Sequence, residues 1–266
     1  MRYSNLHNHT NFSDGKHTVE ENILSAIEKN MLSLGFSDHS FTACDPSYCM
    51  HEHQYPEYFQ TIEEMRRKYA EQIPVYTGME LDVFSEVDRE KLDYIIASAH
   101  YIEKNGVYYP IDHTPQQQIQ CMEEGFGGDI FKMAEHYFQM LAEHVHRVKP
   151  TFVGHYDVIT KFSLMPEDSE KYRDMAKEYL REILKDCSYL EMNTGAISRG
   201  WRKTPYPNGY LLQTLLENDG KLLLGSDSHN KDNLTFFFDE AVEIMKNAGF
   251  TEVAVFNGKT FDMVGI

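Results

Sequence analysis

The chain has 266 residues, 41% of them hydrophobic, which suffices for one large α/β domain with a sizeable core. Its formal net charge of −17 repels a phosphate backbone, so we expect no nucleic-acid partner; without a long apolar run we also expect no membrane span and no signal peptide. The four cysteines show no CxxC spacing, so we expect free thiols and a cytoplasmic enzyme.

Short apolar runs that fit strands alternate along the chain with segments of helical periodicity. Thr18 and Glu21 form a capping box at the first helix, and Pro115 suits the first turn of a later one. In chain order we expect a strand at 3–6, a helix from 18, strand 32–36, helix 55–72, strands 75–79 and 94–99, a helix from 114, helix 129–148, strand 151–154, helix 166–187, strand 189–193, helix 209–218, strand 221–225, helix 232–248 and a further short strand at 253–256. This alternation predicts a parallel α/β fold.

Histidine, aspartate and glutamate, which are common metal ligands, come immediately after most of these strands. His7 and His9 alternate along the first strand, so their side chains point to the same face. The carboxyl ends of parallel strands in a barrel gather at one face, where such residues share a pocket. Imidazole and carboxylate groups suit zinc, iron or manganese, and the set exceeds what one ion needs, so we expect two or three divalent ions with Glu80 as a bridge. The candidate ligands are His7, His9, Asp14, His39, Glu80, His100, His155, Asp227 and His229.

The remaining histidines are expected to have other roles. His17 is close enough to Asp14 in sequence to reach the site as a proton donor. The histidines of the long helix are expected on its solvated face, and those in loops are taken as structural or surface groups: His136, His144 and His146 in the helix, and His51, His53 and His113 in loops. Asp38, Asp82 and Asp157 neighbour candidate ligands and are candidates for orienting imidazole rings.

Basic residues in two loops are candidates for binding phosphate. Arg199, Arg202 and Lys203 follow the sixth strand and Lys161 follows the fifth, and an arginine can grip phosphate with two hydrogen bonds. We favour Arg199 most among these four.

The ordered set of motifs resembles the PHP (polymerase and histidinol phosphatase) family. The match spans nearly the whole chain through His7-Asn8-His9, Ser13-Asp14-Gly15, Ser37-Asp38-His39, Glu80, Ser98-Ala99-His100, Gly154-His155 and Gly225-Ser226-Asp227-Ser228-His229. The resemblance implies a single PHP-type domain over residues 1–266, folded as a distorted (β/α)7 TIM-like barrel with a three-metal site at the carboxyl ends of the strands. By analogy, His7, His9, Glu80 and Asp227 would hold one ion, Glu80, His100 and His155 a second, and Asp14, His39 and His229 the third.

Stand-alone family members of this length look like L-histidinol-phosphate phosphatases of histidine biosynthesis, which implies hydrolysis of a phosphomonoester by a metal-bridging hydroxide, with Glu80 at the centre of the site. Asp14 or His17 would be the acid that protonates the leaving alkoxide. Three other functions stay open: hydrolysis of another small phosphate ester, cyclic phosphate or phosphotyrosine; cleavage of an amide or lactone; and metal binding without catalysis. The second is less favoured because no lysine ends a strand, and the third because the ligand set is complete. The sequence leaves the oligomeric state open.

Overall fold

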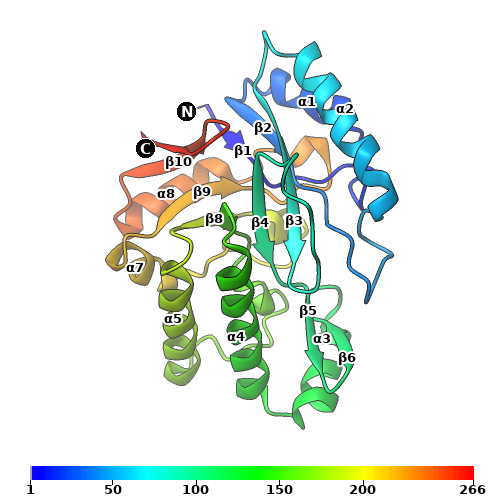
Figure 1. Ribbon diagram of the computed structural model, residues 1–266. Helices are drawn as coiled ribbons and strands as arrows, with labels where there is room; N and C mark the ends of the chain where they lie inside the picture. Colours follow the sequence, from blue (N-terminus) through cyan, green and yellow to red (C-terminus); the bar gives the residue numbers. More distant parts are fainter. Residues whose placement is uncertain (1) are drawn as a thin grey trace.

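Seven parallel strands form the centre of the computed structural model, which describes residues 2–266 (Figure 1). Neighbouring strands in the sheet are consecutive along the chain, except that a small hairpin intervenes between the fourth and fifth. The strands are β1 (Ser4–Asn5), β2 (Ser33–Phe36), β3 (Val75–Asp82), β4 (Tyr94–Ser98), β7 (Phe152–Val153), β8 (Tyr189–Asn193) and β9 (Lys221–Gly225). The predicted parallel α/β fold is therefore confirmed.

The segments just beyond β1 and β9 close the sheet into a barrel. Asn8 and Ser228 form an isolated parallel bridge, in which the His9 N–H donates to the Ser228 carbonyl over 2.8 Å. No helix joins β3 to β4, since residues 83–93 return as a loop. The molecule is thus a distorted seven-stranded TIM-like barrel, as the resemblance implies.

Helices cover the outside of the barrel in two groups (Figure 1). The first packs on the outer faces of β2 and β3, and its leading helix begins with the predicted capping box of Thr18 and Glu21. The second packs on β4, β7, β8 and β9. The first group is α1 (Val19–Glu28) and α2 (Tyr55–Lys68); the second is α4 (Ile130–Val148), α5 (Glu170–Leu184), α7 (Gly209–Glu217) and α8 (Phe238–Ala248).

Several elements differ from the sequence predictions. The third strand continues to Asp82, so Glu80 lies within it rather than after it. The last long helix begins at Phe238 instead of residue 232, because Phe237 has a left-handed φ of 63° that a helix cannot continue through. The unpredicted elements are the hairpin β5 (Tyr101–Lys104) and β6 (Val107–Pro110), a π-helical turn at Cys121–Gly125 after α3 (Pro115–Gln120), the short α6 (Gly195–Ser198), and β11 (Phe261–Gly265), which pairs antiparallel with β10 (Glu252–Phe256) outside the barrel.

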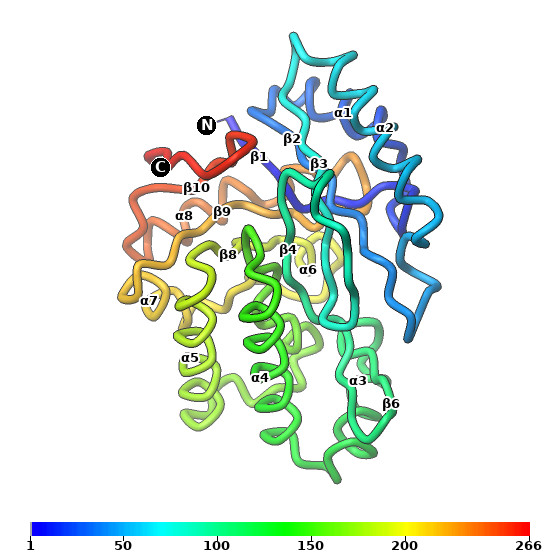
Figure 2. Tube along the Cα trace, viewed as in Figure 1, coloured from blue at the N-terminus to red at the C-terminus, as the bar shows by residue number. Residues whose placement is uncertain are grey.

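Tyr94 fills the barrel interior. A Cβ added at Gly35 or Gly78 would lie within 2.4 Å of its side chain, so only glycine at these two positions leaves room for the ring. Its buried hydroxyl lies 2.5 Å from the Leu6 carbonyl and 2.9 Å from the Phe36 carbonyl, and its one hydrogen can be donated to either. Phe256 and Phe261 of the β10–β11 hairpin pack in the same apolar cluster as Leu6 and Tyr94. This hairpin brings the end of the chain back beside its beginning (Figure 2).

Two further predictions concern single residues of the fold. The four cysteines are free thiols, as expected. The prediction that His144 lies on a solvated face is wrong: it is 1% exposed, and its Nε2 donates to the Leu81 carbonyl over 3.0 Å, which fastens α4 to β3. Among residues 2–266, no helix has both the length and the apolar character that crossing a membrane requires.

Candidate metal centre

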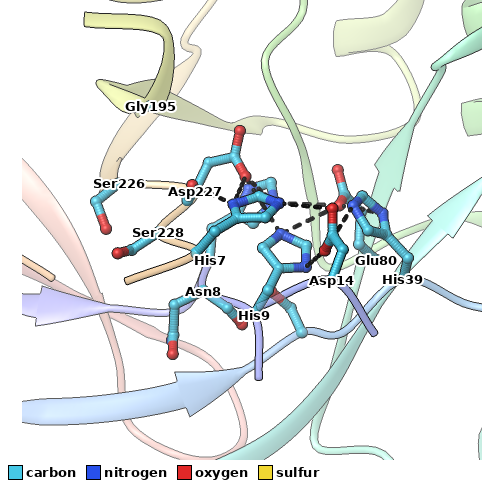
Figure 3. Close-up of polar contacts among 12 residues, drawn as sticks. His7, Asn8, His9, Asp14, His39, Glu80, Gly195, Ser226, Asp227 and Ser228 are labelled. Carbon is cyan, nitrogen blue, oxygen red and sulfur yellow. Dashed lines mark hydrogen bonds and ion pairs between the residues drawn. The ribbon is translucent and has the colours of Figure 1, made fainter. Parts of the chain in front are cut away.

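The nine candidate ligands gather at the carboxyl ends of the strands, and Figure 3 labels His7, His9, Asp14, His39, Glu80 and Asp227 among them. Each of the six histidines has a ring nitrogen within 3.4 Å of a carboxylate oxygen of Asp14, Glu80 or Asp227. Ligands bound about 2.1 Å from a tetrahedral zinc ion lie about 3.4 Å apart, so these separations are those of ligands that share metal ions.

Glu80 lies at the centre of the cluster because β3 directs it into the barrel, where it is 1% exposed. Its Oε2 lies 3.3 Å from His7 Nε2 and 2.9 Å from His39 Nδ1. Its Oε1 lies 3.0 Å from His155 Nε2 and 3.4 Å from His100 Nε2. The two oxygens of one carboxylate therefore face two different groups of imidazoles, which is the geometry a bridging ligand needs.

Asp14 lies close to His39 and His229, and the three form a further group of candidate ligands. Its Oδ2 lies 3.1 Å from His229 Nε2, and its Oδ1 lies 3.8 Å from His39 Nε2. The loop that carries it folds tightly over His9: a Cβ at Gly15 would lie 2.5 Å from the His9 carbonyl. Asp38 holds the same loop by accepting from the Thr10 N–H over 2.8 Å.

Several buried polar atoms of the cluster are not satisfied by hydrogen bonds within the protein and could instead be satisfied by metal ions. Within the described part of the chain, His7 Nε2, both ring nitrogens of His9 and Glu80 Oε2 are buried and make no hydrogen bond of suitable geometry, although other ligand atoms of the cluster lie close to them. Such groups are costly to bury unless something else satisfies them. Burial also lowers the pKa of His9 to about 3, which keeps its ring neutral and able to ligate. The donor set therefore suits divalent metal ions.

Arg199 contacts the cluster from its outer side. Its Nη2 donates to Asp227 Oδ2 over 2.7 Å and its Nη1 to the Asp227 carbonyl over 3.1 Å. Asp227 has a left-handed φ of 44°, and a Cβ at Gly195 would lie 2.9 Å from both Arg199 and Asp227. The backbone is thus shaped locally so that the two side chains can meet.

Glu191 is a site residue that the sequence reading missed. It lies on the inner face of β8, and its Oε2 accepts from His7 Nδ1 over 2.8 Å. Its Oε1 accepts from the His155 N–H over 2.6 Å. Since His7 Nε2 faces Glu80, Glu191 lies on the other side of that imidazole and fixes its tautomer. The available signal was one charged residue inside the apolar strand Tyr189-Leu190-Glu191-Met192.

The expected orienting role of acidic neighbours is confirmed for one of three. Asp82 Oδ2 lies 3.2 Å from His100 Nδ1 and also accepts the His100 N–H. Asp38 instead holds the loop after β1, and Asp157 accepts from the backbone of Asn208.

A cavity of about 450 Å³ opens above the cluster. Arg199 and Lys161 both line it, and the Lys161 ammonium donates to the Asp112 carbonyl over 2.5 Å. Arg202, Lys203 and His17 are not among the lining residues. The guanidinium of Arg202 donates to Thr160, and His17 Nε2 lies 3.2 Å from Asn230 Oδ1. The lining residues are Asp14, His39, Ser47, Tyr48, His100, Asp112, His113, Lys161, Arg199, Trp201, Asp227 and His229.

Several known proteins of similar sequence are named as histidinol-phosphatases or probable histidinol-phosphatases. The chain is 26% identical to the histidinol-phosphatase of Bacillus subtilis, over an alignment that covers 91% of this chain and 99% of that protein. It is also 26% identical to the probable histidinol-phosphatase of Schizosaccharomyces pombe, with 89% and 83% covered.

Two crystal structures share the fold. That of a putative histidinol phosphatase from Listeria monocytogenes gives a TM-score of 0.77 at 22% identity and covers 89% of this chain and 99% of its own. That of the histidinol phosphate phosphatase of Lactococcus lactis, in complex with zinc, L-histidinol and phosphate, gives 0.72 at 22% identity, with 98% and 99% covered.

The family model of the PHP domain matches residues 5–195. The matched segment is more than half of the chain and carries every candidate ligand except Asp227 and His229. The chain therefore belongs to the PHP domain family.

Proposed function

We propose that this protein is a metal-dependent phosphatase that hydrolyses L-histidinol phosphate to L-histidinol and phosphate, a step of histidine biosynthesis. The observation that carries the proposal is the convergence of six imidazoles on Asp14, Glu80 and Asp227 at the floor of one cavity. The names of the relatives in Bacillus subtilis and Lactococcus lactis supply the substrate.

The resemblance to the PHP family implies how the residues would divide among two or three ions of zinc, manganese or iron, and we propose that division here. We assign His7, His9, Glu80 and Asp227 to one ion, since His9 Nε2 lies 3.2 Å from Asp227 Oδ1 and 3.6 Å from Glu80 Oε2. We assign His100 and His155 to a second ion with Glu80, and Asp14, His39 and His229 to a third. When bound, such ions supply an activated water and offset charge on the phosphoryl oxygens.

The side chains around the cluster position the phosphate. Arg199 and Lys161 line the cavity and present cationic groups beside the ligands, where they would bind phosphoryl oxygens as charge develops. Burial alone would raise the pKa of Asp14, but His39 and His229 hold it well below its usual value. This supports Asp14 as an ionised ligand rather than as the acid that protonates the leaving group.

We further propose that the whole chain acts as a single domain. Asp227 and His229 lie beyond the segment that the family model matches, yet they face His9 and Asp14, which follow β1. A division between the two parts would separate His9 from Asp227. The cytoplasmic location expected from the sequence stays a prediction.

The test combines elemental analysis of the purified protein with phosphate release from L-histidinol phosphate. Glu80→Gln should lower the metal content and reduce kcat by at least about 100-fold, because it removes a bridging charge. Asp157→Asn is the matched control: Asp157 is equally buried but contacts no candidate ligand through its carboxylate, so metal content and kcat should change little.

A panel of phosphate esters separates the proposed substrate from its alternatives. L-Histidinol phosphate should have the highest kcat/KM, ahead of a cyclic phosphate, a phosphotyrosine peptide and glycerol phosphate. Full activity of a Glu80→Gln protein that holds no metal would refute the mechanism.

A further inference from the structure

Five residues that line the cavity are neither candidate metal ligands nor candidate phosphate-binding groups. They are Ser47, Tyr48, Asp112, His113 and Trp201. A phosphate held by the metal cluster and by Arg199 and Lys161 would leave its alcohol portion to contact residues of this set. Their chemistry therefore bears on which alcohols the site accepts.

Trp201 presents an aromatic surface at the cavity. It is the only tryptophan of the chain and is 46% exposed. Five other large hydrophobic residues in the described part of the chain are exposed, and none of these five lines the cavity. Phe162 packs edge-to-face on the indole at a centroid distance of 4.9 Å, so the ring is held in place without being covered.

Asp112 supplies a negative charge to the same cavity. Its Oδ2 lies 3.3 Å from the Lys161 ammonium, whereas its Oδ1 is buried, lies 4.0 Å from His113 Nε2 and has no hydrogen-bond partner among residues 2–266. Burial alone would raise the pKa of Asp112, but Lys161 and His100 lower it well below its usual value, so the carboxylate is ionised. An ionised oxygen without a donor is a site for a cationic group of a ligand.

We propose that Trp201 and Asp112 form the subsite for the leaving alcohol, in which the indole stacks on the heteroaromatic ring of L-histidinol and the free carboxylate oxygen binds its ammonium group. This inference rests on the proposed function. It assigns the specificity for the alcohol to two residues outside the metal and phosphate contacts.

Trp201 provides a direct readout of binding, because every change in tryptophan emission comes from this one residue. Titration of the metal-loaded protein with L-histidinol should quench or shift that emission, and alaninol, which has the ammonium and hydroxyl groups but no ring, should leave it unchanged. Unchanged emission at concentrations of L-histidinol that bind by calorimetry would overturn the role of Trp201.

Trp201→Ala should raise KM for L-histidinol phosphate about 5- to 10-fold, whereas KM for glycerol phosphate should stay within about 2-fold of the wild-type value. Trp201→Phe should retain most of the affinity for L-histidinol phosphate. Tyr108→Ala is the matched control: Tyr108 is 45% exposed and packs edge-to-face on Phe84 at 5.0 Å, but it does not line the cavity. Equal losses on both substrates in Trp201→Ala would mean a structural role only.

Asp112→Asn should raise KM by roughly 10- to 100-fold for L-histidinol phosphate, and far less for imidazole phosphate esters without the amine. An effect transmitted through Lys161 would raise KM for all phosphate esters alike, and that result would contradict the proposal. Asp186→Asn is the control, because Asp186 also pairs with a lysine, Lys149, but the pair is more exposed and does not line the cavity.

The two proposals fail in different ways. If L-histidinol changes the Trp201 emission but its phosphate ester is not hydrolysed, the subsite stands and the proposed function fails. If the ester is hydrolysed but the variants do not discriminate between substrates, the function stands and the subsite fails.

Discussion

At the scale of single residues, the imidazole ligands depend on what holds their second ring nitrogen. Glu191 accepts from His7 Nδ1 at 2.8 Å and from the backbone of His155 at 2.6 Å, so one buried carboxylate orients two ligands. A Cβ at Gly225 would lie 2.2 Å from Glu191 Oε2. The strand beside Glu191 is therefore shaped to admit this side chain.

We predict that Glu191→Ala weakens metal binding about 10- to 100-fold, because the His7 ring loses the acceptor that fixes its tautomer. Competition with a chelator measures the affinity. Glu191→Gln keeps an acceptor oxygen, so its metal affinity should lie between those of the wild type and Glu191→Ala. If Glu191→Ala lowers the melting temperature of the metal-free protein but leaves metal affinity intact, Glu191 has a packing role instead.

At the scale of elements, α4 docks on β3 through a buried histidine. Burial lowers the pKa of His144 to about 4, so between pH 6.5 and 4 its ring is protonated in the unfolded chain and neutral in the folded one. The unfolded state then binds more protons, and stability falls as the pH falls through this window. Below pH 4 the loss is complete.

His144→Gln should remove this pH dependence while keeping a donor for the Leu81 carbonyl. From pH 7.5 to pH 5, the wild type should lose about 2 kcal/mol more unfolding free energy than the variant. Urea unfolding of both proteins at the two pH values gives the difference, in which the effect of pH on shared metal ligands cancels. Parallel pH curves would show that His144 is not the titrating group.

The barrel strands are fitted to one large side chain. Gly78→Ala would place a Cβ 2.2 Å from the Tyr94 ring and should cost about 1–3 kcal/mol. Tyr94→Leu shortens that side chain, so the double variant should lose at least about 1 kcal/mol less than the sum of the single losses. Gly209→Ala is the control, since a Cβ there meets no atom within 4 Å. Additive losses would exclude the contact.

Most regular elements could be predicted because apolar periodicity and helix caps are local signals. The β5–β6 hairpin could not, since its exposed Val107 and Tyr108 lack the pattern of a core strand. The late start of α8 also depends on a backbone conformation, at Phe237, which the sequence does not reveal. His144 was misplaced because its burial depends on a carbonyl of another element, at Leu81.

At the scale of the whole molecule, the barrel made the metal cluster predictable. Parallel strands deliver their ends to one face, so residues as distant as His9 and Asp227 could be grouped without knowing any distance. Glu191 was not predicted because it lies within its strand rather than after it, and Asp112 and Trp201 were not predicted because they lie in irregular segments. Arg202 follows the same strand as Arg199, but its contact with Thr160 takes it out of the cavity lining.

The cluster also links the two edges of the barrel. His7 and His9 follow β1, whereas Asp227 and His229 follow β9, and one isolated bridge between Asn8 and Ser228 joins these edges by backbone pairing. Metal ions held by both segments would cross-link the barrel at this closure. Metal binding would then stabilise the folded state, and most strongly there.

Removal of metal with a chelator should therefore open this closure before the rest of the barrel. The amides of His9 and Ser228, which donate to Ser228 and His7 carbonyls, should exchange hydrogen at least about tenfold faster in the metal-free protein. Amides in the β8–β9 ladder should keep most of their protection, because they pair over five residue positions. A uniform rise in exchange across both regions would mean that the ions stabilise the fold globally and do not act as the closing link between β1 and β9.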